Sequence, residues 1–97
     1  MLFMVIERFK SRDARSVYQR FQRNGRMLPD GLTFYESWVE TNFDRCFQIM
    51  ECDDPRLLQE WALHWHDLVD FDFLPVVPGK ETAEVVAPFL TKGPNTC

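Results

Sequence analysis

Glu7 and Gln48 are the two polar side chains of this sequence that are best placed to do chemistry. Glu7 lies near the end of the apolar run Leu2–Phe9, and Gln48 lies within the run Arg45–Cys52. Both runs predict central strands of one sheet, and we expect the two side chains on the same face of that sheet, in a cavity. A carboxylate in an apolar cavity has a raised pKa and can serve as a general acid or base. The alternative is a strand-end glutamate that reaches solvent or pairs with an arginine at a dimer interface.

Three large side chains could form the walls of the same cavity: Tyr35, Trp38 and Met50. Pockets for small molecules are mostly apolar and contain few polar groups. Together with Glu7 and Gln48, these residues therefore predict a ligand-binding site. The alternative is that the three large side chains fill an ordinary dimer core and leave no cavity.

The two histidines do not predict a metal site. His64 and His66 are two positions apart on a predicted helix, which separates them by about 200° around the helix axis. They therefore cannot share a metal ion. His64 stands beside Trp61 and Trp65, where a haem ligand is conceivable, but a packing or boundary histidine is favoured. No metal and no cofactor is predicted.

The cysteines and the paired aspartates also favour structural roles. Cys46 and Cys52 are interpreted as inert thiols, although Cys52 precedes a helix start. Asp53 and Asp54 are best explained as capping residues of the helix that follows. The sequence contains no glycine-rich phosphate loop and no serine nucleophile elbow.

The elements that position these residues are arranged around a hairpin, Leu32–Glu40 and Arg45–Cys52, joined by Thr41–Asp44. The other expected elements are a strand at Leu2–Phe9, a helix from Ser11 or Asp13 to about Asn24, a helix from Asp53 to about Val69, a strand at Phe71–Val77 and a short helix at Lys80–Ala87. The second helix carries a wide apolar stripe: Leu57, Leu58, Trp61, Trp65 and Leu68. Gly25 is expected to end the first helix, and Pro75 places the last strand at a sheet edge.

The order βαββαβ predicts an α+β, ferredoxin-like fold, with a four-stranded antiparallel sheet, the first and third strands central, and helices on one face. We expect the purely apolar strand faces to meet the helices: Leu2, Met4 and Ile6, with Phe47 and Ile49. The bare face would then expose Phe3, Val5 and Met50. A patch of this kind predicts a homodimer in which two sheets stack, as in a dimeric α/β barrel.

Composition limits the classes of function. The chain has 97 residues, of which 45% are apolar, and this predicts one domain over residues 1–90 with a loose tail over 91–97. The net charge of −4 disfavours nucleic acid as a partner. Three cysteines without close pairing predict reduced thiols in a cytoplasmic protein. The apolar N-terminus is too short for a membrane span and lacks the features of a signal peptide.

Several strings of this sequence resemble a bacterial family, the domain-of-unknown-function 3303 group. The resemblance covers about residues 1–90 and rests on Gly25–Leu32, Ser37–Val39, Arg45–Gln48 with Met50-Glu51, Asp53–Pro55, Trp61, Trp65–Phe71 and Pro75-Val76. It implies the fold of the dimeric α/β-barrel superfamily, whose paired sheets enclose a cavity and whose members include small monooxygenases, isomerases, haem-degrading enzymes and ligand-binding proteins. It implies no catalytic residues.

Three hypotheses about function follow. The first is a homodimer that binds a small, mostly apolar molecule in a barrel cavity. The second is a cofactor-free isomerase or monooxygenase that uses Glu7 as acid or base. The third is a structural or interaction module whose sheet face is filled by its partner. The sequence leaves open whether the protein is an enzyme.

Overall fold

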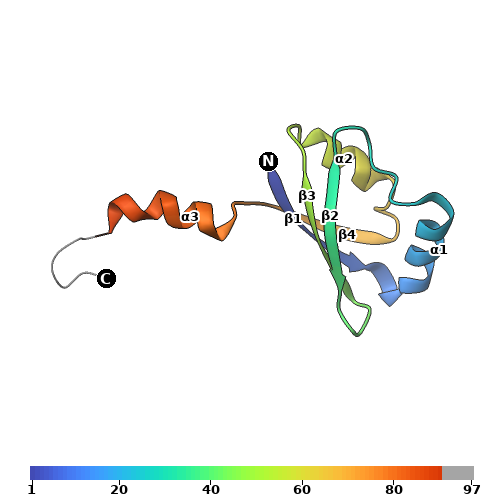
Figure 1. Cartoon of the computed structure of the whole chain (residues 1–97). Coiled ribbons are helices and arrows are strands. Elements are labelled where there is room, and N and C mark those ends of the chain that lie inside the picture. The colour runs from blue at the N-terminus through green and yellow to red at the C-terminus, as the bar shows by residue number, and fades with distance from the viewer. Residues whose placement is uncertain (91–97) are drawn as a thin grey trace.

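The computed structural model describes residues 1–90 of the chain. Figure 1 shows a small sheet with two helices packed on it and a third helix set apart. In chain order the elements are β1 (Leu2–Phe9), the 3-10 helix η1 (Lys10–Arg12), α1 (Ala14–Asn24), β2 (Thr33–Val39), β3 (Arg45–Glu51), α2 (Arg56–Leu63), β4 (Val69–Val76), α3 (Gly79–Val86) and the 3-10 helix η2 (Ala87–Phe89).

The four strands form one antiparallel sheet in the order β2-β3-β1-β4. This confirms the predicted βαββαβ order, with the first and third strands in the centre and Pro75 on the edge strand β4. The order is that of a ferredoxin-like arrangement. The register of β2 against β3 shifts between Phe34 and Glu36, so Tyr35 is the extra residue of a bulge.

Short-range contacts set the helix ends. The Asp13 carboxylate accepts hydrogen bonds from the Ser16 backbone N–H and hydroxyl, and Gly25 ends α1 in the left-handed region at φ +68°. At the start of α2 the N-cap position is Pro55, so the expected N-cap at Asp53 is wrong, and it is Asp54 that accepts the Arg56 N–H. Helix α2 ends at Leu63 instead of near Val69, and β4 begins at Val69 instead of Phe71.

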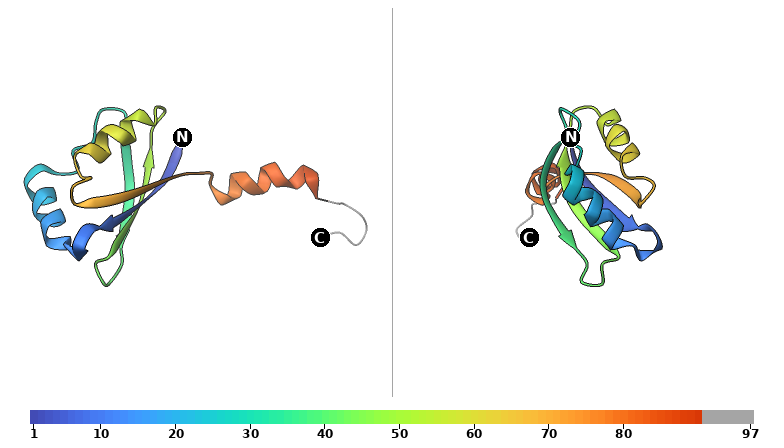
Figure 2. Two further views of the ribbon diagram at one scale, coloured as in Figure 1. Left: turned by 180° about the vertical axis from the view of Figure 1, so that it is seen from behind. Right: turned by 90° about the vertical axis from the view of Figure 1, so that its right-hand side faces the viewer.

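The face of the sheet that meets the helices is not the one predicted from the sequence, so that prediction is wrong. Side chains of directly paired residues share a face, and the buried face carries Phe3, Val5, Glu7 and Phe9 of β1 with Cys46, Gln48 and Met50 of β3. This face meets α1 and α2, which lie together on one side of the sheet (Figure 2). The opposite face carries Leu2, Met4, Ile6, Phe47 and Ile49, which are only half-buried.

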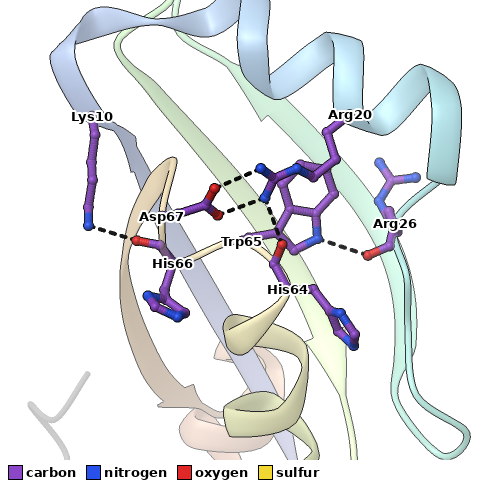
Figure 3. Close-up of polar contacts among 7 residues, drawn as sticks. All are labelled: Lys10, Arg20, Arg26, His64, Trp65, His66 and Asp67. Carbon is purple, nitrogen blue, oxygen red and sulfur yellow. Dashed lines mark hydrogen bonds and ion pairs between the residues drawn. The ribbon is translucent and has the colours of Figure 1, made fainter.

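Polar contacts connect α2 and the turns after it to α1 and to the loop that follows α1 (Figure 3). The indole Nε1–H groups of Trp61 and Trp65 both donate to the Arg26 carbonyl oxygen, at 2.9 and 3.0 Å. Figure 3 draws the bond from Trp65. The Arg20 guanidinium binds the Asp67 carboxylate with two hydrogen bonds of 2.7 Å. These bonds to Arg20 lower the pKa of Asp67 to about 2. The turns after α2 are therefore fixed to α1.

The third helix stands apart from this two-layer unit. In Figures 1 and 2, α3 and η2 extend beyond the end of β4, away from the sheet and both other helices. None of their residues is buried. None of the helices within residues 1–90 combines the length and the apolar character needed to cross a bilayer. The predicted loose tail, 91–97, lies outside the described residues.

The assignment of the sheet faces can be tested by two methionine substitutions. Met50 is fully buried under the helices, so Met50→Ala is expected to lower the free energy of unfolding by about 2–5 kcal/mol. Met4→Ala on the opposite face is the matched control, and a loss below about 1.5 kcal/mol is expected because its side chain is only half-buried. Urea denaturation of dilute protein measures both. A larger loss for Met4→Ala would contradict the assignment.

Candidate functional site

A pocket of about 160 Å³ lies between the sheet and the helix layer, half open to solvent. The sheet contributes Glu7 from β1, Ser37 and Val39 from β2, and Cys46 and Gln48 from β3. The helix layer and its loop contribute Tyr18, Phe21, Arg26, Trp61 and Trp65. The pocket thus has a polar floor on the central strands and a largely aromatic roof.

Strand register brings the polar floor together. Glu7 lies directly opposite Cys46 across the β1–β3 pair, and Gln48 lies opposite Ser37 across the β2–β3 pair. In an antiparallel pair, opposite side chains have Cβ atoms about 4.5–5.5 Å apart. Four polar side chains from three adjacent strands therefore face the same small space.

Burial strongly perturbs the Glu7 carboxyl. Only 8% of the residue is exposed, and burial raises its pKa from the ordinary 4.5 to about 7, while the Arg26 charge opposes the shift. Within residues 1–90, no basic side chain lies within 4.0 Å of this carboxyl. Near neutral pH, Glu7 can therefore both donate and accept a proton.

Arg26 is held at the pocket by aromatic side chains and by its own backbone. Its guanidinium lies 3.5 Å from the ring centre of Phe34 and 5.1 Å from that of Phe21. Its carbonyl oxygen accepts the two indole N–H groups of Trp61 and Trp65. The residue therefore places a positive charge close to Glu7 and at the same time fixes the roof of the pocket.

The thiol of Cys46 faces Glu7 as a neutral group. Burial raises the pKa of Cys46 to about 12, and the nearby Glu7 carboxyl adds to the effect. Burial also raises the pKa of Cys52. Both cysteines are free and buried. Thiols of this kind are weak nucleophiles, which agrees with the inert role expected for them.

The structure divides the five predicted site residues into two groups. Glu7 and Gln48 do share one face and line one pocket, but this pocket lies under the helices and not on the bare sheet face. Met50 is on the same face, fully buried in the core. Tyr35 and Trp38 are more than half exposed, and Trp38 pairs with Phe47 on the opposite face. The prediction that they wall the same cavity as Glu7 is therefore wrong.

The pocket is also lined by Arg26, Tyr18 and Phe21, which were not predicted from the sequence. Trp61 and Trp65 were recognisable as part of the apolar stripe of the second helix, and that stripe was the available signal for the roof. His64 and His66 are exposed outside the pocket. Within the described part of the chain, no three His, Cys, Asp or Glu side chains form a group that could hold a metal ion.

The fold and pocket define a small two-layer α+β protein with a ferredoxin-like strand order and a half-open pocket between its layers. The chain belongs to the family described as domain of unknown function (DUF3303), which matches residues 1–90. No curated protein and no solved structure matches the chain. Membership of this family assigns no activity to the chain.

Glu7 predicts a pH dependence of stability. The folded protein keeps the Glu7 proton up to about pH 7, whereas the unfolded chain loses it near 4.5, so unfolding between these values releases a proton. The contribution of Glu7 to the free energy of unfolding is therefore complete below pH 4.5 and falls by about 3 kcal/mol as pH rises to about 7. Urea denaturation at a series of pH values measures it.

In Glu7→Gln this fall is expected to disappear, because the amide does not titrate. Glu84→Gln, an exposed substitution on α3, is the control and should keep the wild-type pH dependence. Identical pH profiles for wild type and Glu7→Gln would show that Glu7 ionises normally in the folded protein.

Proposed function

We propose that the pocket binds a small, mostly apolar molecule that carries one oxygen-bearing group. The observation that supports this most directly is a carboxyl without an ion-pair partner within residues 1–90, facing a pocket with aromatic walls. A buried polar group without a strong partner is costly, and a ligand that forms a hydrogen bond with it offsets that cost.

The volume limits the size of the ligand. A pocket of about 160 Å³ is close to the apolar cavity of about 150 Å³ that holds benzene in another protein. The ligand is therefore a single ring or a short branched chain, at least for the part that enters the pocket. Trp61, Trp65 and Phe21 supply flat apolar surface for such a group.

The polar floor selects the functional group of the ligand. Protonated Glu7 donates a hydrogen bond to a ligand oxygen, and the Gln48 amide can both donate and accept. The Arg26 charge nearby favours an oxygen that carries partial negative charge. A phenol or a ketone fits this combination better than an amine.

The pocket lies on the other face of the sheet from the cavity expected from the sequence. The pocket is formed by one copy of the chain, between sheet and helices, and needs no paired sheets to enclose it. Membership of the dimeric α/β-barrel superfamily and location in the cytoplasm stay predictions. The hypothesis of a purely structural module is disfavoured by a pocket with four polar side chains on its floor.

The second candidate function is proton transfer without a cofactor, as in an isomerase. The pKa of about 7 favours it, because a general acid or base works best when its pKa is close to the working pH. Glu7 would take a proton from the carbon beside a ligand carbonyl and return it at another carbon. Gln48 would donate a hydrogen bond to the carbonyl oxygen as negative charge develops there.

The binding proposal is tested with phenol as the probe. We expect a dissociation constant of about 1 mM or lower, with the largest NMR shifts at the indole N–H signals of Trp61 and Trp65. Ser37→Phe places a ring in the pocket and should abolish binding. Glu36→Phe, its neighbour on the opposite strand face, is the control and should leave binding intact. Equal phenol binding by both variants would place the site elsewhere.

The proton-transfer candidate is tested with cyclohex-3-enone, whose double bond moves into conjugation with the carbonyl when a proton is relocated. Glu7→Gln is expected to slow this isomerisation at least about a hundredfold, while phenol binding is retained. Ultraviolet absorbance of the conjugated product measures the rate. Isomerisation at the wild-type rate in Glu7→Gln would remove Glu7 from any such reaction and leave the binding proposal standing.

A further inference from the structure

The segment Val77–Leu90, called here the C-terminal arm, carries exposed apolar side chains that pack against nothing else within residues 1–90. The arm consists of a short connector, α3 and η2, and its largest apolar side chain, Phe89, is 84% exposed. Val85, Val86 and Leu90 are exposed with it. Figures 1 and 2 show the arm pointing away from the sheet and from α1 and α2.

A helix of this length does not hold its shape alone. Helix α3 has eight residues, and isolated helices shorter than about 12–15 residues are marginal in water. Most helical stability in proteins comes from packing of an apolar face. The arm therefore requires a surface on which Val85, Val86 and Phe89 can be buried.

The same chain has a second apolar surface without a cover within residues 1–90. This surface, the open face, is the side of the sheet opposite α1 and α2: Leu2, Met4 and Ile6 of β1, Phe47 and Ile49 of β3, Trp38 of β2 and Leu74 of β4. Trp38 and Leu74 are exposed, and the others are half-buried. Ion pairs at its edges, Arg8 with Asp72 and Arg45 with Glu40, leave the centre apolar.

The connector directs the arm outward. Pro78 has φ −54° and ψ 140°, an extended conformation in which the ring fixes φ. Val77 precedes this proline, and a residue before proline is also restricted to extended conformations. To reach the open face of its own sheet, the chain would have to reverse direction within these two residues. The open face of a second copy is therefore the accessible partner.

We propose that the arm of one copy packs across the open face of a second copy, and that the second copy returns the same contact. Each arm then adds a third layer to its partner, helix on sheet on helix. The helical part of the arm, α3 with η2, is about 18 Å long and about 10 Å wide, which covers two central strands. The two contacts together bury roughly 1,000 Å², which is about the minimum that a specific interface requires.

The test is complementation between two variants, read by native mass spectrometry with one partner labelled with nitrogen-15. Phe89→Asp alters the arm, Leu74→Asp alters the open face, and each alone is expected to raise the dimer dissociation constant at least about tenfold. Glu84→Gln, on the polar side of α3, is the matched control and should dimerise normally. Trp38→Asp replaces Leu74→Asp if the latter does not fold.

A mixture of the Phe89→Asp and Leu74→Asp variants tests the proposed contact directly. A heterodimer of the two variants keeps one unaltered arm-on-face contact and confines both substitutions to the other contact. It should therefore form in excess over either homodimer. Dimers of Phe89→Asp as stable as wild type would mean that the sheets stack directly, and a monomeric wild type would mean that the arm folds onto its own sheet or is uncovered. Either result would overturn the proposal.

Discussion

Two hydrogen bonds to one carbonyl oxygen hold the candidate site together. The Arg26 carbonyl accepts the indole N–H groups of both Trp61 and Trp65, which are one helical turn apart at the end of α2 and just beyond it. These bonds fix the loop after α1 against the second helix, so the aromatic roof and the Arg26 side chain are positioned by the same contact.

The sequence was sufficient for the order of elements but not for the faces of the sheet. Alternating residues, the Asp13 cap and Gly25 predicted βαββαβ, and strand order followed from handedness and pairing rules. The faces could not be assigned because β1 and β3 are apolar on both sides. The two buried polar residues, Glu7 and Gln48, favoured the wrong choice, since a polar side chain normally marks the uncovered face.

The site was predicted in the same partial way. Pairing of β1 with β3 was enough to place Glu7 and Gln48 on one face, and this was correct. Tyr35 and Trp38 could not be placed, because the bulge at Tyr35 changes the alternation along β2 by one residue. The roof depends on where the loop 25–32 crosses α2, a tertiary contact that no local pattern encodes.

The two edges of the sheet also decide how the chain can associate. An edge strand with free N–H and C=O groups is a template for another strand, and this is a common route to aggregation. Here one edge strand, β2, contains a bulge, and the other, β4, contains Pro75, which cannot donate a backbone hydrogen bond. Both edges are therefore poor templates. A sheet with this much apolar surface is thereby protected against open-ended growth into fibrils.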